Sequence, residues 1–75
     1  MIVGDVVNVA VQSPQEGVIG GYLKAKVLAL GSHYDVVAIS DHETGVVAQV
    51  EGKYHLLDYV KHHPDEMEEV VLHLL

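Results

Sequence analysis

Histidine and acidic side chains carry most of the chemistry that this chain could perform. Six histidines and eleven acidic residues occur among its 75 residues, and there is no cysteine. Seven of these seventeen residues lie in two runs, Asp41-His42-Glu43 and Lys61–Glu66. Imidazole with carboxylate is a suitable ligand set for zinc or nickel. However, His62 and His63 are neighbours whose side chains point apart on an extended segment, and no His-x-x-x-His pair supports them. We therefore expect no metal site and interpret the second run as a polar connector.

The other requirements of catalysis are also poorly met. Covalent catalysis needs an activated nucleophile, but cysteine is absent and the three serines each lie in or beside an expected turn, where serine is common. Gly20-Gly21 lacks the spacing of a phosphate-binding loop, and Asp41-His42-Glu43 is typical of a solvated turn. We therefore expect that the protein is not an enzyme and has no cofactor.

The net charge excludes a further class of function. Four lysines and no arginine face eleven acids, giving a formal charge of −7 at pH 7. Nucleic-acid binding depends on basic side chains that neutralise phosphates, and arginine is the commonest base-reading residue. We expect no direct nucleic-acid binding. The acidic surface suits a basic protein partner, and it also keeps a small apolar domain soluble.

Four stretches with strand-like composition must position these side chains. They span residues 3–12, 22–30, 33–40 and 46–51, and glycine-marked turns separate them. Branched residues favour strands, and apolar residues alternate with polar ones along several stretches. The pattern predicts a mainly β fold, a five-stranded antiparallel barrel in one small domain. The expected core residues are Val7, Val9, Val27, Val37, Ile39 and Val50.

Two later segments are less regular. Residues 33–40 are apolar on both faces at their centre, so this strand should be covered on two sides. Gly45 should close the turn that begins at Asp41, because glycine readily adopts positive φ. For residues 54–60, we expect a short turn of helix followed by a closing strand, since Leu56, Leu57 and Val60 have helical spacing.

The end of the chain predicts an amphipathic helix. Pro64 suits the first helical position, and Asp65 and Glu66 suit the first turn, where the helix dipole favours acids. The apolar stripe of this helix has i, i+3, i+4, i+7 spacing and consists of Met67, Val70, Val71 and Leu74. A helix of about twelve residues is not stable alone. We therefore expect residues 1–62 to form the barrel and residues 63–75 a helix of the same domain.

The strand pattern resembles that of Tudor-like domains within the SH3-like barrels. The resemblance covers residues 3–60 and lies in Val3-Gly4-Asp5, in Tyr22–Val27, in Tyr34–His42 and in Leu56–Val60. It implies a five-stranded barrel. Tudor domains that read methylated lysine or arginine hold the cation between aromatic rings. The corresponding positions here are Val11, Ile39 and His42, so the resemblance does not extend to methyl reading.

These observations favour a non-catalytic protein–protein interaction module or small regulator. We expect it to use the helix stripe of Met67, Val70, Val71 and Leu74 together with a barrel edge, and to form a homo-oligomer, most simply a dimer. Two alternatives stay open. One is an acidic inhibitor in the basic cleft of a nucleic-acid-binding enzyme, and the other is an oligomeric barrel that binds a small molecule. No run of about 18 apolar residues predicts a membrane span, so a cytoplasmic location is the default expectation.

Overall fold

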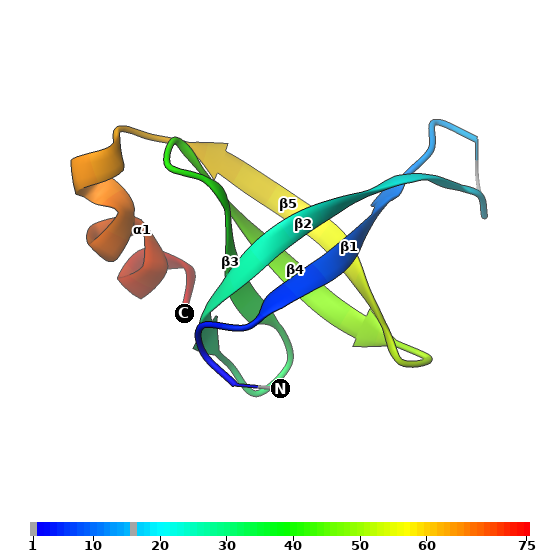
Figure 1. The fold of residues 1–75 in the computed structure, drawn as a ribbon, viewed down its shortest axis with the longest axis horizontal. Coiled ribbons are helices and arrows are strands. Elements are labelled where there is room, and N and C mark those ends of the chain that lie inside the picture. Colours follow the sequence, from blue (N-terminus) through cyan, green and yellow to red (C-terminus); the bar gives the residue numbers. More distant parts are fainter. Residues whose placement is uncertain (1, 16) are drawn as a thin grey trace.

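A computed structural model describes residues 2–15 and 17–75. Five strands precede a short 3-10 turn and one α-helix, so the chain is mainly β (Figure 1). The elements are β1 (Val6–Gln12), β2 (Ile19–Leu30), β3 (Asp35–Ser40), β4 (Glu43–Val50), β5 (Lys53–Lys61), the 3-10 turn Pro64–Glu66 and α1 (Met67–Leu74). The predicted barrel and C-terminal helix are confirmed.

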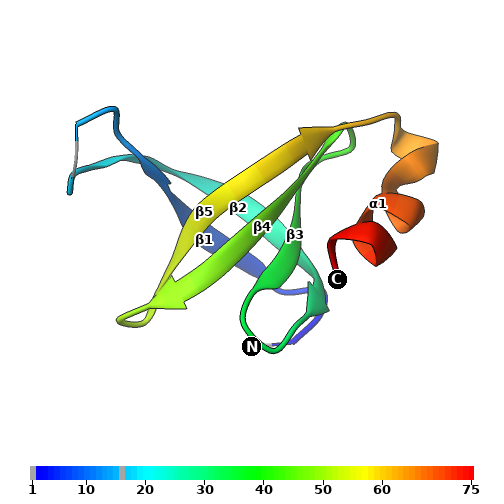
Figure 2. The ribbon, with the colours of Figure 1, turned by 180° about the vertical axis from the view of Figure 1, so that it is seen from behind.

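The five strands follow one another around a closed barrel in the order β1-β2-β3-β4-β5 (Figures 1 and 2). Consecutive strands are antiparallel. The closing pair differs from the expected antiparallel arrangement, because β1 and β5 run parallel, with Val9 opposite Tyr54 and Ala10 opposite His55. The reason is geometric: in an up-and-down series with an odd number of strands, the first and last strands point the same way.

The core is built from small branched residues on four strands. Val9, Val27, Val37 and Val47 are each 0% exposed, and Ala25 completes the buried cluster. Val7 is half-buried and packs against this cluster. Ile39 is also half-buried, so most of the predicted core is at least partly covered. Val50 is a wrong prediction, since its side chain is 53% exposed. It is the last residue of β4, where the hairpin projects beyond the core.

Strand β3 is covered on both faces, as its composition predicts. Val36 and Val37 point to opposite sides of the strand, and both are completely buried. Val37 belongs to the barrel core, whereas Val36 faces outward. The segment just before β3 also contacts the helix, because Tyr34 donates its hydroxyl to the carbonyl oxygen of Leu74 at 2.9 Å.

Two expectations about the second half of the chain are wrong. Residues 54–60 contain no helical turn but lie within β5, which pairs with β4 from Lys53 to Lys61 except for a bulge at Leu57. Gly45 lies in β4 rather than in the turn, and it is buried. A Cβ atom there would lie 2.9 Å from Leu56 Cδ1 and 3.0 Å from Ile39 Cδ1. Glycine therefore gives room to the ends of these two side chains, which would have to shift to admit a larger residue, and positive φ plays no part.

The β4–β5 connection explains why β5 is a single strand. Val50 pairs with Lys53, so Glu51 and Gly52 form a two-residue turn. Both have positive φ, +52° at Glu51 and +80° at Gly52, as in a type I′ turn. This turn matches the natural twist of two strands and directs residues 53–61 back along β4. Register along a partner strand thus outweighs the helical spacing of Leu56, Leu57 and Val60.

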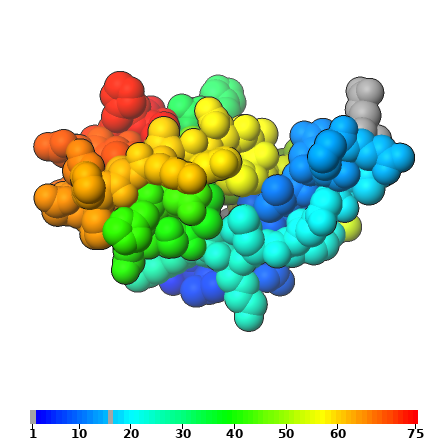
Figure 3. All heavy atoms as spheres, turned by 90° about the horizontal axis from the view of Figure 1, so that it is seen from above, coloured from blue at the N-terminus to red at the C-terminus, as the bar shows by residue number. Residues whose placement is uncertain are grey.

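The molecule is elongated, with extents of 35 × 23 × 19 Å. The β1–β2 hairpin reaches out at one end, and α1 lies at the other (Figures 1 and 3). The segment that links the barrel to α1 leaves β5 at Lys61 and passes the β3–β4 turn, where the amide of His62 donates to the carbonyl oxygen of His42 at 2.8 Å. The helix therefore sits beside the end of the barrel opposite the β1–β2 loop.

Candidate partner-binding surface

The helix α1 rests on the barrel through its predicted stripe but is not enclosed by it. Met67, Val70, Val71 and Leu74 are all half-buried, and no residue of α1 is fully buried. The helix contacts β4 and is held near its end by the hydrogen bond from Tyr34 to Leu74. The stripe thus contacts the chain's own barrel, while a large part of its apolar area stays accessible.

A histidine fixes the start of this helical segment. His62 Nδ1 lies 2.7 Å from the carbonyl oxygen of His63, which can only accept, so Nδ1 donates. In the neutral ring Nε2 is then an acceptor, and the completely buried Thr44 donates its hydroxyl to it at 2.6 Å. The imidazole therefore connects β4 to the backbone just before the 3-10 turn. Both of its nitrogens are engaged within the protein.

The turn that follows is capped by an acidic side chain. Glu66 Oε1 accepts the amide hydrogen of His63 at 2.9 Å, and the amide of Glu66 donates to the carbonyl oxygen of His63 at 3.0 Å. This reciprocal pair satisfies backbone groups that helix starts otherwise leave free. Across residues 2–15 and 17–75, no group of three or more histidine and acidic side chains is arranged to hold a metal ion. The run Lys61–Glu66 is a structured joint in this fold.

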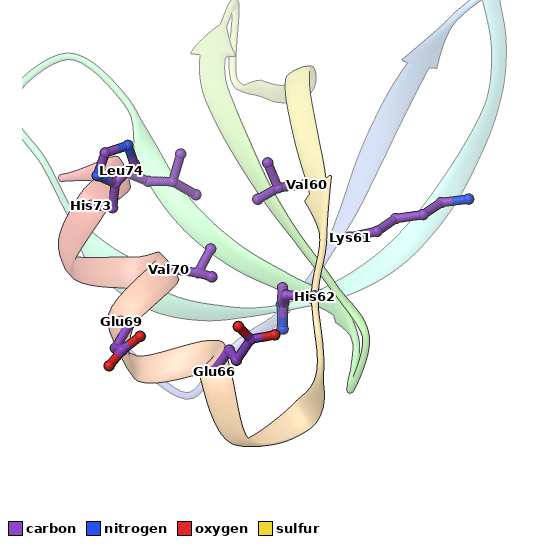
Figure 4. Close-up of a pocket in the computed structure, with 8 residues that line it drawn as sticks. All are labelled: Val60, Lys61, His62, Glu66, Glu69, Val70, His73 and Leu74. Atoms are coloured by element: carbon purple, nitrogen blue, oxygen red, sulfur yellow. The ribbon is translucent and has the colours of Figure 1, made fainter.

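One groove runs between β5 and α1, and we call it the β5–α1 groove. It has a volume of about 440 Å³ and is lined by Val60, Lys61, His62, Glu66, Glu69, Val70, His73 and Leu74. Val60, Val70 and Leu74 face one another across it, while Lys61 extends away (Figure 4). Its floor is apolar, and its rim carries both acidic and basic groups.

A second groove lies on the other flank of the helix, and we call it the β2–α1 groove. It has a volume of about 510 Å³ and is lined by Leu28, Pro64, Asp65, Met67, Glu68, Val71 and Leu72. Five of these seven residues are apolar, and the two charged ones are both acids. The helix stripe is thus divided, with Val70 and Leu74 in one groove and Met67 and Val71 in the other.

Apolar side chains are also exposed along the outer half of β5. In the described structure, β1 pairs with β5 at Tyr54 and His55, so the part of β5 beyond them has β4 on one side and no strand on the other. Leu57 and Tyr59 in this part are 59% and 49% exposed. The amide of Tyr59 donates to Asp58 Oδ1 at 2.8 Å. Because free edge amides attract other strands, this carboxylate partly protects the edge.

We call α1, its two grooves and the outer half of β5 the helix-end surface. The sequence pattern identified the four stripe residues, and the structure brings all four to this surface. The sequence pattern did not identify Leu28, Val60 or Leu72, which also line the two grooves. Leu28 lies in β2, far from the helix in sequence, so its position depends on the barrel closing. Leu72 is the one of the three that the sequence could have indicated, because it is a large apolar residue outside the helix stripe. In the structure it is 70% exposed.

Comparison of the chain with protein-family models, with curated proteins and with solved structures finds no match. In the part of the chain that the structure describes, no helix is long and apolar enough to cross a membrane. The function therefore has to be argued from the helix-end surface and from the distribution of charge.

Proposed function

We propose that the protein is a non-catalytic protein–protein interaction module that binds its partner through the helix-end surface. The observation that carries the proposal is that α1 has no fully buried residue and lies between two grooves whose floors are apolar. Contiguous exposed apolar patches are uncommon on small soluble proteins and often mark sites of interaction. Leu57 and Tyr59 on β5 extend the patch beyond the grooves, and Leu72 on α1 is 70% exposed where it lines the β2–α1 groove.

A partner protein fits this surface better than a second copy of the chain. Asp65, Glu66, Glu68 and Glu69 are all exposed along the helical segment. Two-fold pairing through α1 would place this acid-rich segment on both sides of one interface, and the β2–α1 groove has no basic lining residue that could meet the acids of the other copy. The homodimer expected from the sequence is the alternative, and sedimentation of the purified protein would detect it.

We also propose that the barrel is related to Tudor-like domains. A small closed five-stranded barrel supports it, and the parallel β1–β5 pair is a feature that a Tudor-like assignment has to accommodate. The tyrosines are distributed over β2, the segment before β3, and β5. Their separation gives no support to a methyl-reading function.

The second candidate is an acidic inhibitor that occupies a basic cleft. It is favoured by the net charge of −7 and by the four acids within residues 65–69. Salt separates the two functions. Binding by charge mimicry should weaken steeply between low and physiological ionic strength, whereas binding through an apolar surface should change little.

Affinity capture from the source organism with matched variants tests the proposal. The variant Leu57→Ser/Leu72→Ser removes exposed apolar side chains from the helix-end surface. The control Val18→Ser/Val50→Ser removes exposed apolar side chains next to the β1–β2 loop and at the end of β4, where they are 46% and 53% exposed. We expect a stoichiometric partner with the wild type and the second variant, and its loss with the first. Equal capture by both variants, or no partner with any of the three proteins, would contradict the proposal.

A further inference from the structure

We propose that the β2–α1 groove binds a basic amphipathic helix of the partner, with apolar side chains on the groove floor and lysine or arginine beside Asp65 and Glu68. This inference rests on the proposed function and specifies the chemistry of the partner. Its basis is the combination of an apolar floor with a rim whose charged groups are all of one sign.

The floor of the groove is formed by elements that are far apart in the sequence. Leu28 comes from β2, and Met67 and Val71 come from α1. All three are half-buried, so each contributes both to the contact between helix and barrel and to the accessible surface. Leu72 is 70% exposed at the side of the groove. An inserted apolar side chain would cover these residues, which is how an amphipathic helix anchors in a groove.

The charge at the rim determines which kind of amphipathic segment fits. Asp65 and Glu68 line the β2–α1 groove, whereas no lysine or histidine is among its lining residues. The β5–α1 groove differs, because Lys61, His62 and His73 accompany its two acids. A cationic side chain would therefore meet uncompensated carboxylates in the first groove and mixed charges in the second.

The surroundings also indicate how the partner would be oriented. Leu28 on β2 contributes no charge to the strand side of the groove. The acids lie on the helix side. A bound segment should accordingly place its basic residues over α1 and its apolar residues between α1 and β2, since complementary potentials fix the register of a complex.

The chain offers a matched pair of charge variants for the test. Glu68 and Glu69 are adjacent and both exposed, but Glu68 lines the β2–α1 groove and Glu69 lines the other. Glu68→Lys and Glu69→Lys change the net charge equally. The probe is a labelled Leu/Lys peptide of about 14 residues with leucines at helical spacing, long enough to form a helix on binding. Fluorescence anisotropy measures its affinity for the full chain.

We expect the Leu/Lys peptide to bind the wild type. Glu68→Lys should weaken binding about fivefold or more, and Glu69→Lys less than about twofold, which is the scale of exposed charge contacts. An analogous apolar pair is Leu72→Ser, at the groove, and Leu75→Ser, which lines neither groove; only the first should weaken binding. Circular dichroism checks that each variant is folded. If either lysine variant is unfolded, the pair Glu68→Gln and Glu69→Gln is used in its place.

Several results would overturn the inference. They are no binding of the Leu/Lys peptide, equal weakening by the two charge variants, or equal binding of a peptide with the same composition in shuffled order. A wild-type dimer that the peptide does not dissociate would show that a second copy occupies the groove. If the captured partner depends on Leu57 and Leu72 but responds equally to Glu68→Lys and Glu69→Lys, the proposed function stands and this inference fails.

Discussion

At the scale of single residues, His62 and Gly45 have roles that differ from those that their neighbours in the sequence suggest. His62, in a run that resembles a set of metal ligands, accepts a hydrogen bond from Thr44 and positions the helical segment. Gly45, in a run that resembles a turn, gives room to Leu56 and Ile39. Neither role can be read from neighbours in the sequence, because the partner atoms lie on other strands.

Tyr54 carries a prediction about pH. It packs against the barrel core, and burial, together with the negative charges of Asp35 and Asp5, raises the pKa of its phenol above the ordinary value of 10.0. The folded state therefore holds the phenol proton more tightly than the unfolded state does. The resulting stabilisation is present below pH 10 and is lost as the pH rises through the pKa of the folded state.

Replacing Tyr54 by phenylalanine should remove this dependence. We expect the free energy of unfolding of the wild type, measured in urea, to fall more steeply above about pH 10 than that of Tyr54→Phe. Every other residue is the same in both proteins, so the difference between the two curves isolates Tyr54. Parallel curves over this range would contradict the assigned environment.

At the scale of elements, local patterns predicted the elements with strong signals and missed those set by pairing. Proline at position 64 followed by acids and an apolar stripe correctly indicated the C-terminal helix. Alternation indicated the first four strands, although their ends differ, with β2 beginning at Ile19 and β4 at Glu43. The segment 54–60 was misassigned because its helical spacing is local, whereas its conformation is imposed by the register with β4.

The type I′ turn between β4 and β5 gives the prediction at this scale. Glu51 has a φ of +52°, which costs a side chain other than Gly, Asn or Asp about 1 kcal/mol. Glu51→Asn should therefore raise the free energy of unfolding by about 0.5–1 kcal/mol. Glu51→Gln removes the same charge without the conformational preference and should leave stability nearly unchanged. Urea denaturation measures all three proteins, and an Asn variant no more stable than the Gln variant would contradict the turn.

At the scale of the whole molecule, the arrangement places two different structures at opposite ends. The β1–β2 hairpin projects at one end, and α1 with its grooves occupies the other (Figures 1 and 3). The sequence was sufficient for the barrel class and for the helix stripe. It was insufficient for the grooves, because these require Leu28 of β2 to lie beside Met67 and Val71 of α1. Such a contact follows from barrel closure and from the joint at His62.

Mapping the bound partner on the isotopically labelled full chain by amide NMR tests the central claim most directly. With the partner obtained by affinity capture, we predict that the perturbed amides gather in α1, in the outer half of β5 and around Leu28. Amides near the β1–β2 loop should keep their free positions. Perturbations concentrated in that hairpin, with α1 unaffected, would contradict the assignment of the helix end as the binding surface.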